Sequence, residues 1–377
     1  IKQNISTAER TGGIIEPLPK LQWFINVNKP IKERNNKTLK DLMREPFEKE
    51  EIKIIPDYFS KTYFHWIDNL RDWCISRQIW YGHQIPVWYK GSEIYCGIEP
   101  PRESGWEQDP DTLDTWFSSG LWTFSTLGWP DTKTKDFQLF HPTQVLETGY
   151  DILFFWVARM ILMSTYHVGN IPFQKVFLHG LVRDKNREKI SKSKGNAIDP
   201  IEMMEKYGTD ALRFGLVFNT APGTDIALAE DKIKGMKHFA NKLWNIARFI
   251  LSKTEKTDFQ DQFEFDLNKA TAADRMILEK LKITITKATE GLEEMELHTA
   301  AQEIYQFTWH ELADIYVEAS KAQLDNPDSE KLTRQILAYN LISVLKLLHP
   351  FMPFVTEIIW DKLPGEKMLM ISTWPEK

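Results

Sequence analysis

Basic and hydroxyl side chains cluster in residues 189–196 (KISKSKGN). Between Arg183 and Lys194, six residues are basic and two are acidic, which gives a net charge of +4. Ammonium groups neutralise phosphate charge, hydroxyls add hydrogen bonds, and Gly195 lets the backbone approach a ligand closely. The segment therefore indicates a loop that binds a polyphosphate. A run of lysines and serines on its own is also typical of a solvated basic turn or of a phosphorylation or localisation patch.

The residues that follow make the first interpretation more specific. Asn196–Pro200 (NAIDP) leads to Tyr207–Arg213 (YGTDALR), and the combined pattern resembles the class I aminoacyl-tRNA synthetases. The resemblance implies that Lys189 and Lys192 are catalytic, because they stabilise the triphosphate of ATP while an amino-acid carboxylate attacks the α-phosphorus. Positioned charge then does the chemistry without a protein nucleophile. The ATP-binding residues that the resemblance implies in this loop are Ser191, Lys192 and Ser193.

A strand–helix–strand unit is predicted immediately before this loop. Thr143–Thr148 and Lys175–Val182 are predicted as buried strands, and Asp151–Thr165 is apolar nearly all round, as in a buried helix. Such a βαβ unit implies a parallel sheet, in which ligands bind beyond the carboxyl ends of the strands. Taken alone, Asp151 could also be a plain helix N-cap, and His179 a structural histidine. The ATP contacts that the resemblance implies at these strand ends are Gly149, Asp151, His179, Gly180 and Val182.

The amino-acid pocket is indicated by blocks that resemble the valyl members of the family. The resemblance maps the valine pocket onto Trp116, Ile152 and Trp156, of which the last two are spaced i, i+4 and so share one helix face. Two indoles and a branched aliphatic form a small apolar box that excludes isoleucine by volume, whereas threonine is disfavoured by only about 100-fold. For each tryptophan, the alternative role is packing in the core. For the chain as a whole, the alternative to a valyl enzyme is an isoleucyl enzyme. The blocks that carry the resemblance are Asn69–Gln78, Ile79–Tyr89, Leu113–Ser119, Gly149–Met160, Thr224–Arg248 and His349–Trp360.

The second half of the chain is predicted to be helical. Apolar residues recur at helical spacing over 277–292, 304–319 and 335–348. Pro350 and Pro353 must end the last of these helices, and a new one is expected over 354–363. The predicted fold is therefore α/β plus all-α, with the second half of a Rossmann-like catalytic domain in residues 1–215 and a helix bundle in 216–377.

The resemblance implies that this bundle is an anticodon-binding domain. A basic stripe runs along 232–248, and lysines and arginines would supply the salt-dependent part of tRNA affinity. For each of these basic residues, the alternative is that it only lies on a solvated helix face and contacts no tRNA. The tRNA contacts that we expect are Lys234, Lys237, Lys242 and Arg248.

Composition places the chain among ordinary globular proteins. It has 377 residues, a net charge of −6, 42% hydrophobic residues and two cysteines, which excludes collagen-like, disordered and disulfide-scaffold classes. We expect a cytoplasmic protein with no membrane partner, because neither a membrane span nor a basic-then-apolar leader is found. Valine, ATP with Mg²⁺ and tRNA(Val) are the implied ligands, and no protein-bound metal is expected.

The start of the chain carries the least information. Lys32–Lys40 and Glu48–Glu51 are predicted as a solvated connector. No histidine lies in a HIGH-type motif, so we expect that the N-terminal half of the nucleotide fold and the editing insertion are missing. That half would then be a required partner, and the chain alone would show little activity. The alternative outside the enzymes is a non-catalytic module that binds tRNA or serves in assembly.

Overall fold

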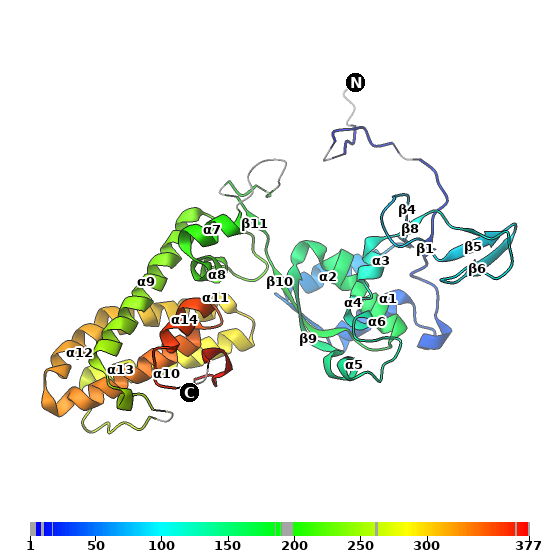
Figure 1. Ribbon diagram of the computed structural model, residues 1–377. Coiled ribbons are helices and arrows are strands. Elements are labelled where there is room, and N and C mark those ends of the chain that lie inside the picture. Colours follow the sequence, from blue (N-terminus) through cyan, green and yellow to red (C-terminus); the bar gives the residue numbers. More distant parts are fainter. Residues whose placement is uncertain are drawn as a thin grey trace. The chain divides into compact units, whose positions relative to one another are not determined.

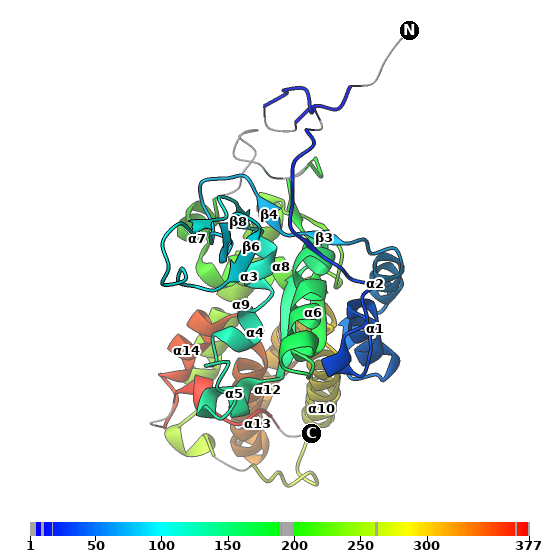
Figure 2. The same cartoon turned by 90° about the vertical axis from the view of Figure 1, so that its right-hand side faces the viewer.

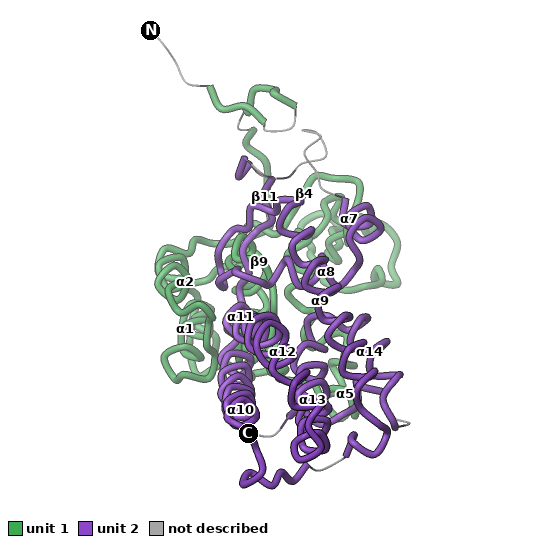
Figure 3. Tube along the Cα trace, turned by 90° about the vertical axis from the view of Figure 1, so that its left-hand side faces the viewer, with its two compact units in different colours: residues 1–176 green, residues 177–377 purple. Residues whose placement is uncertain are grey.

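The computed structural model describes residues 5–8, 11–16, 18–184, 186–188, 190, 199–260, 263–365 and 368–375 (Figure 1). The chain forms two compact units, residues 1–176 and 177–377 (Figure 3). The boundary between them falls within a single strand, β10 (Phe173–His179). The predicted phosphate-binding residues Lys189, Ser191, Lys192 and Ser193 lie outside the described residues.

A three-stranded sheet in the order β2-β10-β9 contains the predicted βαβ unit. Strand β9 (Thr143–Gly149) is followed by the 3₁₀ turn η2 (Tyr150–Ile152), the π-helical turn η3 (Leu153–Val157) and helix α6 (Ala158–His167). The chain then returns as β10, the neighbour of β9 in the sheet. Every residue from Ala158 to Thr165 is buried, which confirms the second half of the predicted buried helix, whereas Asp151 and Phe155 in the turns before it are exposed. Strand β2 is Lys53–Ile55.

The predicted solvated connector is wrong at residues 39 and 40, where a helix begins, whereas most of residues 32–38 and all of 48–51 are exposed. Helix α1 (Leu39–Glu48) begins with a reciprocal capping box between Thr38 and Asp41 and buries Leu39, Leu42 and Met43. It packs against α6 and α2 (Tyr58–Asp68), as Figure 2 shows for α1 and α2. With Pro46, the four buried residues of α1 have helical spacing, but charged residues on both sides of them dominate the composition of the segment.

Short strand pairs lead the chain to the helices around the pocket described below. Their pairing fixes where helix α3 (Thr115–Ser119) starts, because β8 runs directly into it. Helices α4 (Trp122–Ser125) and α5 (Lys135–Phe140) follow. The antiparallel pairs are β1 (Phe24–Ile25) with β3 (Trp73–Cys74), β4 (Ser76–Arg77) with β8 (Thr112–Leu113), and β5 (Val87–Lys90) with both β6 (Glu93–Cys96) and β7 (Glu107–Gln108).

The second unit is mainly a helix bundle, as predicted. Its long helices bury one continuous apolar core that includes Phe239, Leu281, Ile304 and Leu341. Helix α13 ends at Leu348, before the two prolines, as the sequence predicted. The helices are α7 (Pro200–Tyr207), α8 (Thr209–Val217), α9 (Glu230–Lys253), α10 (Ala272–Glu293), α11 (Leu297–Gln306), the π-helical η6 (Phe307–Tyr316), α12 (Val317–Leu324), α13 (Pro327–Leu348) and α14 (Pro353–Trp360).

Two residues of the YGTDALR motif hold the turn between α13 and α14. Asp210 accepts the backbone N–H groups of Phe354 at 3.2 Å and Val355 at 2.6 Å, at the start of α14. Met352, at the N-cap position of α14, makes no capping bond, so Asp210 supplies the cap from another helix. Arg213 donates to the carbonyl of Pro350 at 3.2 Å. Part of this motif therefore serves the packing of the bundle.

Candidate active site

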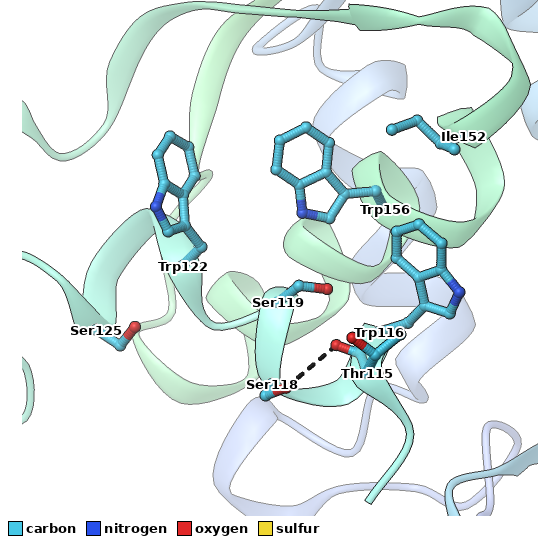
Figure 4. A pocket seen from close by; sticks show the side chains of 8 residues that line it. All are labelled: Thr115, Trp116, Ser118, Ser119, Trp122, Ser125, Ile152 and Trp156. Carbon is cyan, nitrogen blue, oxygen red and sulfur yellow. Dashed lines mark hydrogen bonds between the residues drawn. The ribbon is translucent and has the colours of Figure 1, made fainter. Parts of the chain in front are cut away.

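A pocket of about 570 Å³ lies in the first unit and brings together the three residues predicted for the amino-acid side chain (Figure 4). Trp116 comes from α3, Ile152 from η2 and Trp156 from η3. Residues 40 positions apart in the sequence thus share one cavity, which is within the size range of small-molecule sites. The residues that line the pocket are Thr115, Trp116, Ser118, Ser119, Trp122, Ser125, Ile152 and Trp156.

Asp114 holds the wall that carries Trp116. It is buried at the N-cap of α3, where its Oδ1 accepts the backbone N–H of Trp116 at 3.3 Å. Its Oδ2 accepts the indole N–H of Trp73 at 3.1 Å and pairs with Arg77 at 2.9 Å. The carboxylate therefore fixes the start of α3 to two neighbouring strands.

Arg159 supports the wall that carries Trp156. The side chain is buried, and its guanidinium lies 3.9 Å from the centre of the Trp73 ring and 4.9 Å from that of Phe154. Burial lowers the pKa of Arg159 to about 10, so the group stays cationic at neutral pH. Phe155 stacks on Trp116, with ring centres 5.9 Å apart.

The sequence missed Trp122 as a wall of this pocket. Its ring centre lies 6.0 Å from that of Trp156, and the residue is 51% exposed. Together with Thr115, Ser118, Ser119 and Ser125, it makes the cavity wider and more polar than the small box that was expected. The only sequence signal was its place just after the LDTWFSS block.

The predicted nucleotide-binding residues in the first unit lie where β9 ends. Gly149 is buried and forms the N-cap of η2, with a φ of −64° that any residue can adopt. Asp151 is exposed in η2 and is not an N-cap. An exposed carboxylate at a strand end is placed to accept hydrogen bonds from a ligand.

The predicted nucleotide-binding residues in the second unit lie between β10 and β11 (Val182–Arg183). His179 ends β10, and its Nδ1 lies 2.7 Å from the carbonyl oxygen of Gly180. A Cβ atom on Gly180 would lie 1.9 Å from the carbonyl oxygen of Thr224, so the backbone needs glycine here. Val182 pairs in parallel with Ile226 of β12 (Ile226–Ala227).

The basic residues of α9 are not equivalent. Lys234 and Arg248 are exposed. Lys237 donates to the carbonyl of Lys206 at 3.0 Å, and Lys242 pairs with Asp314 at 2.7 Å. Lys242 also lies 5.4 Å from the centre of the Trp309 ring. Two of the four predicted tRNA contacts are therefore already engaged within the unit.

In the described part of the chain, no group of three or more His, Cys, Asp or Glu side chains could hold a metal ion. Nor does any described helix combine the length and apolarity that crossing a membrane requires.

Comparison with known families agrees with this geometry. The family model "tRNA synthetases class I (I, L, M and V)" matches residues 10–103 and 101–229, more than half of the chain. The chain belongs to the class I tRNA synthetases. A second model, "Anticodon-binding domain of tRNA ligase", matches residues 274–377, within the predicted helix bundle.

Curated relatives of this class I synthetase chain are valine–tRNA ligases. Those of Geobacillus kaustophilus (strain HTA426) and Bacillus subtilis (strain 168) are each 44% identical over 380 aligned residues. The alignments cover 99% of this chain and 42% of each relative. The chain therefore spans less than half the length of the curated relatives it matches.

Solved class I synthetases share the fold at low sequence identity. The methionyl-tRNA synthetase of Mycobacterium tuberculosis, bound by methionyl-adenylate, matches with a TM-score of 0.71 and 20% identity, over 95% of this chain and 66% of that one. A leucyl-tRNA synthetase of Agrobacterium radiobacter, in a ternary complex with tRNA and LeuAMS, matches with a TM-score of 0.64 and 21% identity, over 81% and 42%. These similarities confirm the α/β plus helix-bundle architecture.

Proposed function

We propose that this chain is part of a valine–tRNA ligase, in which it provides the amino-acid pocket, part of the ATP site and the anticodon-binding helices. The observation that carries the proposal is the shared pocket of Trp116, Ile152 and Trp156, the three residues that the sequence predicts around an isopropyl side chain. Identity of 44% to valine–tRNA ligases along 99% of the chain supports the same substrate.

The reaction has two steps. The carboxylate of valine attacks the α-phosphorus of ATP, the bond to the bridging oxygen breaks, and pyrophosphate leaves with Mg²⁺ bound to it. The terminal ribose hydroxyl of tRNA(Val) then attacks the acyl carbon, and AMP leaves. In this proposal Lys189 and Lys192 neutralise the departing pyrophosphate. The remaining ATP contacts are Gly149, Asp151, His179, Gly180, Val182, Ser191 and Ser193.

The helices after residue 215 are the tRNA-binding part in this proposal, and residues 1–215 are the catalytic part. Arg248 and Lys234 are the strongest candidates for phosphate contacts because their side chains are exposed. Lys242 and Lys237 must exchange an internal partner for phosphate. Filter binding of tRNA(Val) at two salt concentrations checks this, with Arg248→Ala expected to weaken binding more than Lys242→Ala. Equal effects would contradict the distinction.

Amino-acid-dependent ATP–pyrophosphate exchange tests the proposal. We expect valine to support exchange better than isoleucine when this chain is combined with the N-terminal half of the nucleotide fold that we expect as its partner. The chain by itself should show little exchange, and the intact enzyme should work in the cytoplasm. Better exchange with isoleucine would establish the isoleucyl alternative, which a cavity of about 570 Å³ does not exclude by size. No exchange with either amino acid would favour a non-catalytic module.

A further inference from the structure

One buried hydroxyl in the pocket wall has no hydrogen-bond partner in the part of the chain that the structure describes. Ser118 and Ser119 are adjacent in α3 and both border the pocket. The Ser118 hydroxyl donates to the carbonyl of Thr115 at 3.1 Å, within the helix. The Oγ atom of Ser119 is buried and has no such partner among the described residues. A buried polar atom without a partner is costly, and a ligand can supply the missing bond.

The position of this hydroxyl makes it relevant to the amino-acid side chain. Figure 4 shows the Ser119 oxygen on the pocket side of α3, directed between the indoles of Trp116 and Trp156. Gly120 holds this part of α3 close to α6, because an added Cβ there would lie 3.1 Å from Met163 and 3.4 Å from the Arg159 carbonyl. The two helices therefore lie close together at this point, and the serine hydroxyl can change its direction by rotation about the Cα–Cβ bond.

Valine and threonine differ in what they offer this group. The isopropyl group of valine has no polar atom, so the Ser119 hydroxyl stays unpaired when valine is bound. Threonine has nearly the same shape and replaces one methyl by a hydroxyl that can both donate and accept. Of the four hydroxyl residues that line the pocket, Ser119 is the one with a buried Oγ that has no partner in the described structure, so it can pair with that hydroxyl.

We infer that Ser119 is a specificity-determining residue of this pocket, whose hydroxyl forms a hydrogen bond with the side chain of a bound threonine and so weakens the rejection of threonine relative to valine. The inference rests on the proposed function, since it assumes that the pocket takes the side chain of the amino acid. It assigns part of the acceptance of threonine to one oxygen atom, which Ser119→Ala removes.

The test compares threonine and valine as substrates in ATP–pyrophosphate exchange, with this chain complemented as described above. We expect Ser119→Ala to lower the ratio of kcat/KM for threonine to that for valine about 3- to 10-fold, the range of one neutral hydrogen bond. Thr123→Val is the matched control. Thr123 also has a buried hydroxyl without a partner in the described structure, but it lies in α4 outside the pocket lining, so its variant should keep the wild-type ratio.

The possible outcomes distinguish a failure of the inference about Ser119 from a failure of the proposed function. A lower ratio in Ser119→Ala with an unchanged ratio in Thr123→Val supports the inference. An unchanged ratio in Ser119→Ala overturns it while valine-dependent exchange leaves the proposed function intact. Equal decreases of this ratio in both variants also overturn the inference, because the effect would then not depend on a hydroxyl in the pocket wall. If the wild type shows no valine-dependent exchange, the proposed function fails and the inference falls with it.

Discussion

The guanidinium of Arg159 lies 3.9 Å from the centre of the Trp73 ring, and its Nη1 has no hydrogen-bond partner in the part of the chain that the structure describes. Trp73 in turn donates to Asp114, which caps the helix of Trp116. A buried cation thus connects the two walls of the pocket through an aromatic ring. Cation–π contacts away from water contribute about 2 kcal/mol or more.

The first prediction concerns this buried cation. Arg159→Ala should lower the free energy of unfolding by about 3 kcal/mol, because it removes both the cation–π contact and the packing of the side-chain stem. Arg159→Met keeps most of the volume without the cost of burying a charge, so its loss should be smaller. Urea unfolding followed by tryptophan fluorescence measures both. Equal losses in the two variants would show that charge, and not packing, dominates.

The second prediction compares two tryptophans of the pocket. Trp156→Ala should raise the KM for valine at least about tenfold, because it removes a partly buried wall in direct contact with the side-chain site. Trp122→Ala should have a smaller effect, since Trp122 is 51% exposed and buries less surface against a ligand. Exchange kinetics at varied valine concentration, with the KM for ATP as the internal control, give both values. A larger increase of the KM in Trp122→Ala than in Trp156→Ala would indicate that the side-chain site lies nearer to α4.

The third prediction is a pH dependence at Asp210. Burial raises the pKa of this carboxyl above 3.8, although its two backbone hydrogen bonds oppose the shift. The folded state therefore holds the proton more tightly than the unfolded state, so the contribution of Asp210 to stability decreases as the pH rises above about 3.8. Relative to Asp210→Asn, the wild type should lose stability between pH 4 and pH 7.

Urea midpoints of the wild type and Asp210→Asn at several pH values measure this difference. Asp210→Ala serves as the second variant, because it also removes the cap of α14 and should cost about 1 kcal/mol. A gap between wild type and Asp210→Asn that stays constant from pH 4 to pH 7, or that changes in the opposite direction, would refute the assignment.

The fourth prediction uses two glycines. Gly180→Ala should destabilise the protein by about 2 kcal/mol or more, because its Cβ would lie 1.9 Å from the carbonyl oxygen of Thr224. Gly235 lies inside α9, and no atom of the described residues lies within 4 Å of an added Cβ, so Gly235→Ala should stabilise the protein by roughly 0.5–1 kcal/mol. Thermal unfolding compares the two. A neutral Gly180→Ala variant would mean that β11 and β12 can separate at little cost.

Much of the fold follows from local patterns in the sequence. The strands around residues 146 and 176, the all-apolar helix between them and the break at Pro350 depend on the order of neighbouring residues, and the structure has them all. The spacing of Ile152 and Trp156 likewise placed both side chains on one face. Where charged residues surrounded a short apolar stripe, as in α1, the same reasoning failed.

Contacts between distant segments were decided by the tertiary structure alone. The sequence could not show that Trp122 and Ser119 border the pocket, that Asp210 caps a helix 144 positions away, or that Asp314 pairs with Lys242. Periodicity reports which side of an element is apolar, because side-chain direction repeats every 3.6 residues in a helix and every two in a strand. It carries no information about which other element packs against that side, because that depends on how separate elements fill space around a shared core.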